Sequence, residues 1–448
     1  MRVRASVAKI VGKSIQWGLR TFSKGGSSLP GKLALKIDPK ILDTLAKDYE
    51  IVVVTGTNGK TMTTALTVNI LRQSFDQVLT NSTGANMVQG IVSSFLEAKS
   101  QKGVKKFAVL EIDEASLSKI AEHIKPKLFV FTNIFRDQMD RYGEIYTTYQ
   151  MILDGASRIP TATILCNGDS PLFHSTTMKN PQKYYGFDHL PDQEQMAHYN
   201  TEGVLCPRCQ NILHYHMITY ANLGKYYCPN CGFHRPPLDV RLSKLEEITP
   251  TSANFIIDDE EYKIEVGGIY NVYNALAATA VAKYYGIESS KIREGLRVDE
   301  KVFGRQEIIS IDGKKLTIIL VKNPVGLNQV IDMLELLSHS FTLTMLLNAN
   351  YADGIDTSWI WDGNHEKLAK MQILKVISGG ERAHDLTRRL QVAGIEKEKL
   401  VEVKSDFNRL LAEIKSVPTE EVYVLATYTA MIELRKNLAN TGYLEGGF

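Results

Sequence analysis

The sequence lacks long hydrophobic runs, a strong excess of one charge, and a cysteine-rich pattern. None of its apolar runs approaches the roughly 20 residues of a membrane-spanning helix. Its 52 basic and 50 acidic residues leave a formal net charge of +2, which argues against a nucleic-acid-binding protein. Only five of its 448 residues are cysteines, and four of these form two CxxC pairs, which argues against a disulfide framework and for a reducing compartment. The remaining composition is typical of soluble globular proteins with two or three domains.

A glycine-rich loop follows a short β-branched run. Residues 51–55 predict a strand and residues 64–71 predict a helix. The loop between them contains Gly56, Thr57, Asn58, Gly59, Lys60 and Thr61. In such a loop backbone N–H groups approach phosphate oxygens, Lys60 reaches the β/γ-phosphates, and the Thr61 hydroxyl holds Mg²⁺. The spacing is shorter than that of a full P-loop, so the alternative is a coincidental glycine-rich turn. The strand before the loop and the helix after it make this alternative the weaker one.

Strand-like and helical patterns alternate after this loop. Residues 107–111, 128–133 and 162–166 read as strands separated by helices, which predicts a parallel, doubly wound sheet. Glu111 ends one strand, where ligands gather in such sheets, and is therefore a candidate Mg²⁺ ligand. Asn133, Asp137 and Asp140 follow another strand end, and helix capping is the alternative for the two acids. Further strands at 316–321, 342–347, 373–377 and 421–426 predict a second α/β domain. We expect one domain over residues 1–305 and another over 306–448.

Four of the five cysteines form two CxxC pairs, Cys206 with Cys209 and Cys228 with Cys231, eighteen residues apart. This spacing is typical of a Cys₄ zinc ribbon, here predicted over about residues 200–236 as an insertion. All four ligands would be used, so the zinc is expected to be structural. A redox CxxC is the less favoured alternative. Cys166 lies in an apolar strand and is expected to be buried.

The N-terminal segment is the one charge-biased part of the chain. Residues 1–40 contain nine basic residues and a single acid, Asp38. Val7, Val11, Ile15 and Leu19 recur every fourth residue, which predicts a helix. The helix either rests on an anionic membrane or near a lipid-linked substrate, or packs as an ordinary helix with a solvated basic face, which we rank slightly higher. A transit peptide ranks last.

An alanine-rich helical segment over residues 267–282 opens with two asparagines. Asn271 and Asn274 are candidates to face a ligand, with helix capping as the alternative for each. Gly304 and Arg305 then end the first domain.

The glycine loop, Glu111, the motif from Thr132 to Gly143, the asparagine pair and Gly304-Arg305 follow one another as in the Mur ligases, and the chain resembles that family from about residue 30 onward. The resemblance implies a P-loop ATPase domain followed by a Rossmann-like domain. It also implies ATP-dependent formation of an amide bond. By carry-over, residues 56–61 bind phosphate, Thr61 and Glu111 bind Mg²⁺, and Asn271 and Arg305 contact the nucleotide.

The zinc ribbon and residues 351–362 are similar to one branch of this family, the synthetase subunits of lipid II isoglutaminyl synthase. That resemblance implies phosphorylation of the α-carboxylate of D-glutamate in lipid II, followed by attack of ammonia. It also implies a heterodimer with a GatD-like glutaminase and a cytoplasmic location, with the inner membrane face as a further option. We hypothesise that Asp356, or second Asp353, orients the partner's catalytic histidine. The equally weighted alternative makes Trp359 and Trp361 core residues and the acids caps.

Departures from the wider family pattern bear on the substrate. Gln138 stands where a metal-binding histidine is usual, Tyr270 replaces another histidine, and residues 146–153 contain no lysine for carbamoylation. The aspartate usual at the start of the last domain is absent from residues 318–324. These differences put an amino-acid-adding ligase in doubt, although a Mur or folylpolyglutamate-type ligase remains the alternative.

Overall fold

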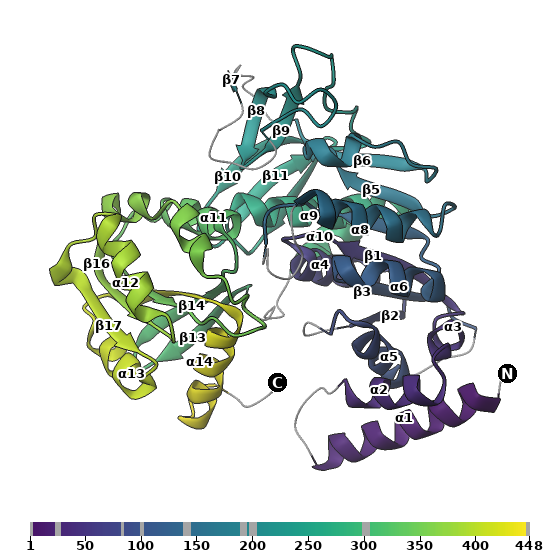
Figure 1. The fold of residues 1–448 in the computed structure, drawn as a ribbon, viewed down its shortest axis with the longest axis horizontal. Coiled ribbons are helices and arrows are strands. Elements are labelled where there is room, and N and C mark those ends of the chain that lie inside the picture. The colour runs from purple at the N-terminus through teal and green to yellow at the C-terminus, as the bar shows by residue number, and fades with distance from the viewer. Residues whose placement is uncertain are drawn as a thin grey trace.

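The computed structural model describes residues 3–22, 28–81, 85–98, 103–137, 145–188, 195–196, 204–297 and 305–444. Two α/β units lie side by side, and a small β-sheet projects from the first of them (Figure 1). Among these residues no helix combines the length and apolar character needed to cross a membrane.

The first unit is built on a nine-stranded sheet with the order β12-β11-β10-β6-β5-β4-β1-β3-β2. Its strands are β1 (Tyr49–Thr55), β2 (Gln77–Thr80), β3 (Lys106–Glu111), β4 (Leu128–Phe131), β5 (Thr163–Asn167), β6 (Gln182–Phe187), β10 (Val240–Ile248), β11 (Ala253–Ile257) and β12 (Glu260–Ile264). The strands from β2 to β10 are parallel, whereas β11 and β12 add an antiparallel edge. The sheet predicted from the sequence is confirmed, and the antiparallel edge is an addition that the sequence pattern did not predict.

Helices cover both faces of this sheet because the central strands are apolar on both sides. Val52 and Val54 pack toward α4 (Lys60–Arg72), α9 (Ile269–Tyr284) and α10 (Ser289–Leu296). Ile51 and Val53 pack toward α3 (Ile41–Leu45), α5 (Val88–Glu97), α6 (Glu114–Ile124) and α8 (Ile145–Ser157). Helices α1 (Val3–Phe22) and α2 (Leu29–Ile37) add an outer layer on α5. Fully buried parallel strands have this continuous apolar character.

The second unit contains a six-stranded sheet in the order β13-β14-β18-β15-β16-β17. Its strands are β13 (Arg305–Ile311), β14 (Lys314–Leu320), β15 (Phe341–Leu346), β16 (Ile373–Gly379), β17 (Leu400–Lys404) and β18 (Glu421–Ala426). Its helices are α11 (Pro324–Leu334), η2 (Ser358–Asp362), η3 (His365–Lys370), α12 (Ala383–Val392), α13 (Phe407–Ser416) and α14 (Tyr428–Asn440). They again lie on both faces, as the two separate core clusters require. A domain boundary after residue 305 remains a prediction.

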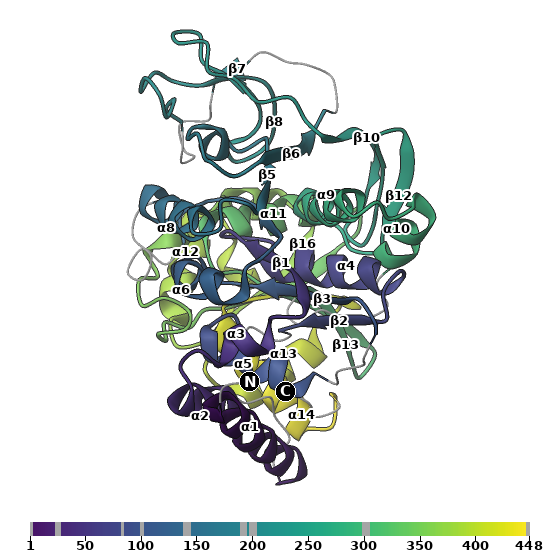
Figure 2. The ribbon, with the colours of Figure 1, turned by 90° about the vertical axis from the view of Figure 1, so that its right-hand side faces the viewer.

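The cysteine-bearing segment forms a third sheet of β7 (Gln195–Met196), β8 (His214–Tyr220) and β9 (Leu223–Tyr227). It lies between β6 and β10, which are parallel neighbours in the large sheet, so the ribbon interrupts a single crossover. The ribbon and α1 lie at opposite ends of the molecule in two perpendicular views (Figures 1 and 2).

Candidate nucleotide site and zinc ribbon

The loop between β1 and α4 has a backbone that requires glycine at two positions. Gly56 and Gly59 have φ angles of 128° and 85°, a region that L side chains rarely adopt. A Cβ at Gly56 would lie 2.4 Å from Thr132 Oγ1, and one at Gly59 would lie 2.2 Å from Asn274 Oδ1. Both glycines are therefore required by conformation and by close packing, and Gly59 is also the N-cap residue of α4.

Residues after β4 fix the shape of the loop. The backbone N–H of Thr57 donates to Asn133 O at 2.9 Å, and the backbone N–H of Asn58 donates to Asn133 Oδ1 at 2.9 Å. The hydroxyl of Thr132 donates to Asn58 O at 2.8 Å. Asn133 follows the end of β4, as expected from the sequence. Its backbone and side-chain oxygens hold the loop by accepting from Thr57 and Asn58. A loop held in this way is preorganised for phosphate, since few groups need reordering on binding.

Lys60 is buried at the start of α4 and is paired with an acid that the sequence reasoning missed. Its Nζ donates to Gly56 O and lies 3.0 Å from Glu114 Oε1. Burial lowers the pKa of Lys60, but the carboxylates of Glu114 and Glu111 outweigh burial and raise that pKa above its ordinary value. Lys60 is therefore a cation at the loop. The signal for Glu114 was its position three residues after Glu111, in the first turn of α6.

Glu111 lies at the carboxyl end of β3, in register with Val54 of β1. Asn81 holds its backbone from both sides, accepting from Glu111 N at 2.9 Å and donating to Glu111 O at 2.7 Å. The side chain of Glu111 is buried, and its carboxylate helps to raise the pKa of Lys60. Thr61 stands in the first turn of α4. A carboxylate and a hydroxyl are the hard oxygen donors that suit Mg²⁺, which takes its other ligands from phosphate and water.

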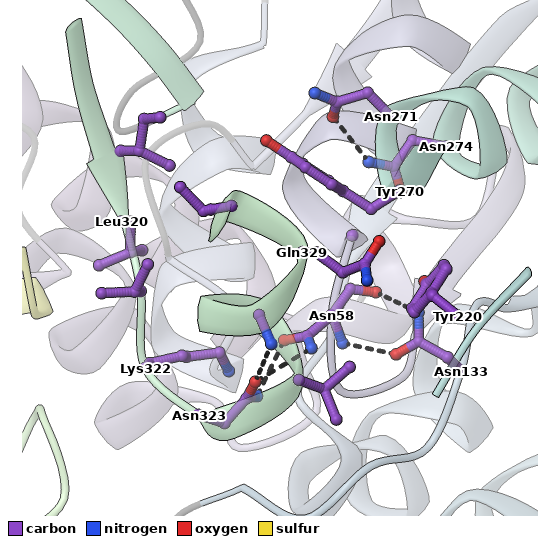
Figure 3. Close-up of a pocket in the computed structure, with 16 residues that line it drawn as sticks. Asn58, Asn133, Tyr220, Tyr270, Asn271, Asn274, Leu320, Lys322, Asn323 and Gln329 are labelled. Atoms are coloured by element: carbon purple, nitrogen blue, oxygen red, sulfur yellow. Dashed lines mark hydrogen bonds between the residues drawn. The ribbon is translucent and has the colours of Figure 1, made fainter. Parts of the chain in front are cut away.

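Asn271 and Asn274 are buried near the start of α9 and lie in the pocket lining that also includes Asn58 and Gly59 of the loop (Figure 3). The amide of Asn274 donates to Asn271 Oδ1 at 3.2 Å, and the amide of Asn271 donates to Gly267 O at 2.7 Å. They line a cavity of about 60 Å³ together with Tyr270 and residues of the second unit. Gly268 is the N-cap residue of α9 and no side chain caps the helix, so the capping alternative is wrong for both asparagines. The cavity has room for waters but is smaller than a nucleotide site.

The second unit closes this cavity through contacts that the sequence did not predict. Asn323 and Asn58 form a reciprocal amide pair, with N···O distances of 3.0 and 3.3 Å. Lys322 forms an ion pair with Asp137. Gln306 accepts from Gly267 N and donates to Gly267 O, both at 3.1 Å. The two units are therefore joined directly at the phosphate loop and at the asparagine helix.

Some predicted residues lie outside the described part of the chain. Gln138, Asp140 and Gly304 are among them, as is the side chain of Arg305. The backbone of Arg305 belongs to β13 and pairs with Ile319 of β14.

The four cysteines of the ribbon converge, as predicted. All four sulfur atoms lie within 4.8 Å of one another, with Cys206 and Cys231 3.6 Å apart and Cys209 and Cys228 3.5 Å apart. A tetrahedron with zinc–sulfur bonds of about 2.3 Å has sulfur–sulfur edges of about 3.8 Å. The donor set and its size therefore fit a structural zinc ion. None of the histidines that the structure describes belongs to this cluster.

A buried ion pair anchors the ribbon to the large sheet. Arg235 follows the last cysteine pair, and its guanidinium lies 2.9 Å from Asp169 Oδ1 and 2.9 Å from Asp188 Oδ1. Asp169 also accepts from Phe187 N and from the hydroxyl of Tyr273, each at 2.7 Å. Because Tyr273 belongs to α9, this network connects the ribbon to the helix that carries the two asparagines.

The segment from Tyr351 to Asp362 divides into buried and exposed parts. Asp353 is buried and accepts from Thr429 N at 2.7 Å and from Asn350 N at 3.1 Å. Asp356 is exposed, and hydrogen bonds from Ser358 lower its pKa. Asp353 thus has a structural role, because it accepts from the backbone at Thr429 and Asn350. Asp356 presents a charged carboxylate at the surface.

The aromatic residues of this segment divide in the same way. Trp359 packs on the core of the second unit, whereas Tyr351, Ile355 and Trp361 are 75%, 63% and 49% exposed. The alternative that made both tryptophans core residues therefore holds for Trp359 alone.

Comparisons with known proteins agree along the whole chain. The model of the Mur ligase middle domain matches residues 54–282, and that of the MurT ligase C-terminal domain matches residues 320–431. The MurT subunit of lipid II isoglutaminyl synthase (glutamine-hydrolyzing) from Streptococcus pneumoniae is 54% identical, over 98% of each chain. The corresponding Staphylococcus aureus subunit is 37% identical over 86% of each chain.

Solved structures show the same fold. A pseudomurein peptide ligase type C from Methanothermus fervidus superposes with a TM-score of 0.68, at 22% identity, over 90% of this chain and 81% of that one. This chain therefore belongs to the Mur ligase family and is an enzyme of its MurT group.

Proposed function

We propose that this chain uses MgATP to convert the α-carboxylate of D-glutamate in the lipid II stem peptide into the amide, with ammonia from a glutaminase partner. The observation that carries the proposal is the near-full-length similarity to the Streptococcus pneumoniae subunit, whose name contains lipid II isoglutaminyl synthase (glutamine-hydrolyzing). The loop at residues 56–61, with its cationic Lys60, supplies the phosphate site that the reaction needs.

The proposed reaction has two steps because a carboxylate is a poor electrophile. A carboxylate oxygen attacks the γ-phosphorus of ATP, ADP leaves, and an acyl phosphate forms. The nitrogen lone pair of ammonia then attacks the acyl carbon, the carbon–oxygen bond to phosphate breaks, and a proton is lost. Negative charge develops on the transferring phosphoryl group in the first step, so cationic groups beside it lower the barrier.

Different residues of the loop are assigned to the phosphates and to Mg²⁺. Backbone N–H groups of residues 56–61 cradle the phosphates, and Lys60 exchanges part of its contact with Glu114 for phosphate oxygen. Thr61 and Glu111 would hold Mg²⁺, which neutralises charge on the phosphates when bound. Asn271 and Arg305 are assigned to the rest of the nucleotide. Because the cavity of about 60 Å³ is too small for a nucleotide, Asn323 and Asn58 must separate to admit it.

Zinc has a structural part in this proposal. Four thiolates leave no open coordination position, so the ion cannot activate water or substrate. It would hold the ribbon, which Arg235 ties to Asp169 and α9.

The glutaminase partner is assigned to the surface of residues 351–362. Tyr351, Ile355 and Trp361 are exposed there, and large apolar and aromatic side chains are typical anchors of protein interfaces. Asp356 stands among them with an ionised carboxylate, and we assign it to the partner's catalytic histidine. Asp353, the second choice from sequence, is already engaged by Thr429 and Asn350.

An amidation assay on lipid II with ATP tests the reaction. We expect product when the chain, the candidate glutaminase and glutamine are combined, and at most ammonium-dependent product from the chain alone. Lys60→Ala should abolish it, while Lys119→Ala, an exposed lysine on α6, should not. ATP consumption that instead attaches a free amino acid would support the alternative, an amino-acid-adding Mur ligase.

A separate assay tests the assignment of Asp356. Glutaminase turnover of the pair should fall about 100-fold or more in Asp356→Asn, because loss of an orienting carboxylate misplaces the histidine. Asp362→Asn is the matched control, since it removes another exposed carboxylate of the same segment, one that pairs with Arg136. Unimpaired turnover in Asp356→Asn with an intact complex would exclude this role.

A further inference from the structure

Helix α1 packs on the molecule through very small residues. Ala5, Ala8 and Gly12 are the buried positions of its inner face. A Cβ at Gly12 would lie 2.6 Å from Leu96 Cδ1 of α5, so the helix approaches its neighbours closely. Of the four residues whose spacing predicted this helix, Val11, Ile15 and Leu19 are half-buried beside the packed face and Val7 is exposed.

The opposite face of α1 presents large apolar side chains to the outside. Val3, Ile10 and Trp17 are 80%, 66% and 70% exposed, and Val7 is 45% exposed. Successive residues are about 100° apart around a helix, which places Val3, Ile10 and Trp17 on the side away from the alanines and glycine, and Val7 at the edge of that side. Figures 1 and 2 show α1 as the outermost helix at its end of the molecule.

Positive charge borders this apolar face. Arg4, Lys9 and Lys13 are exposed on α1, and Lys32 and Lys36 are exposed on α2. Within the described residues none of these five forms an ion pair with an acid. Helix α1 contains no acidic residue. The apolar stripe is therefore bounded by cations whose charge is available to an outside partner.

We propose that the outer face of α1 docks on an anionic lipid surface, with Val3, Val7, Ile10 and Trp17 entering the headgroup region and the neighbouring cations contacting lipid phosphate. An exposed apolar stripe, flanking lysines and a tryptophan are the features of helices that lie in the plane of a membrane. Helix α1 lacks the apolar character needed to cross a bilayer. The inference rests on the helix alone and goes beyond the proposed reaction, although a lipid-linked substrate would give it a use.

Vesicle sedimentation with the full chain tests this inference. The vesicles contain phosphatidylglycerol and phosphatidylcholine, or phosphatidylcholine alone, at low salt. Wild type should sediment with the anionic vesicles and be released by salt. Its tryptophan fluorescence, to which Trp17 contributes together with Trp359 and Trp361, should shift to the blue. Ile10→Ser/Trp17→Ser should weaken binding about tenfold or more. Lys9→Gln/Lys13→Gln should weaken it roughly 25-fold, since each cation near such a surface contributes about fivefold.

Matched variants keep the test specific. Leu374→Ser/Val392→Ser removes two other exposed apolar side chains and should bind vesicles like wild type, and circular dichroism should show all variants folded. Equal binding of the α1 variants and wild type would overturn the proposal, as would no binding by wild type. A wild-type dimer that Ile10→Ser/Trp17→Ser converts to monomer would overturn it in favour of contact between copies. No ATP or lipid II is present, so these failures would leave the proposed reaction standing.

Discussion

The ion pair between Arg235 and Asp169 offers the sharpest quantitative test of how the zinc ribbon is held. The Asp169 side chain is 0% exposed and that of Arg235 is 8% exposed. Arg235→Met keeps most of the aliphatic length but removes the charge, so it strands a buried carboxylate with the Phe187 N–H and the Tyr273 hydroxyl as its remaining donors. Breaking a buried pair from one side costs about 3–5 kcal/mol.

This magnitude translates into a measurable thermal shift. For a unit of this size each kcal/mol lowers the melting temperature by about 2–4 °C, so Arg235→Met should melt roughly 6–20 °C below wild type in scanning calorimetry. Arg158→Met is the matched control. Its pair with Glu122 is exposed and contributes at most about 1 kcal/mol. Adding Asp169→Asn to Arg235→Met should recover much of the loss, because no buried charge then remains.

The pH dependence supplies an independent readout. Burial raises the pKa of Asp169, and Arg235 opposes that rise. Without Arg235 the folded protein binds a proton on Asp169 at pH values where the unfolded chain has released it. Stability of Arg235→Met should therefore fall as pH rises through that window, and its deficit should be smaller at pH 5 than at pH 8. Equal melting shifts for Arg235→Met and Arg158→Met would refute the reasoning.

Three further predictions concern the loop, the metal and a buried histidine. Gly59→Ala should reduce nucleotide affinity at least about tenfold by titration calorimetry, because its Cβ meets Asn274; Gly286→Ala, with positive φ but open space, should not. Cys209→Ser, or a strong chelator, should lower the zinc measured by mass spectrometry and expose the ribbon to protease; unchanged resistance in metal-free protein would contradict a structural zinc. Burial, aided by a nearby guanidinium, lowers the pKa of His365 to about 4. The unfolded chain therefore binds a proton first, and wild type should lose about 3 kcal/mol between pH 7 and pH 4 from this group, a loss absent in His365→Phe.

Much of the architecture could be predicted from local patterns. The β-branched run before the glycine loop is β1, the alanine-rich run is α9, and the cysteine spacing produced a four-sulfur cluster. These features depend on residues close together in the chain, whose side-chain period or spacing carries the information.

Contacts between distant segments could not be predicted in this way. Asn58 and Asn323 are 265 positions apart, and Arg235 and Asp169 are 66 apart. Lys60 could be assigned to phosphate from its loop, but its pairing with Glu114 depends on how β3 and α6 lie against β1. Sheet order and domain contact decide such pairs, and no local pattern encodes either.

Helix α1 shows most clearly what the sequence decides and what the tertiary structure decides. The sequence by itself predicted a helix from Val7 to Leu19 within the basic segment 1–40, because periodicity and charge are local properties. The sequence could not determine which side of the helix faces the protein, since one side carries small residues and another carries large apolar residues. Only the tertiary structure decided that, because close approach to Leu96 admits Gly12 and the alanines and leaves Ile10 and Trp17 outside.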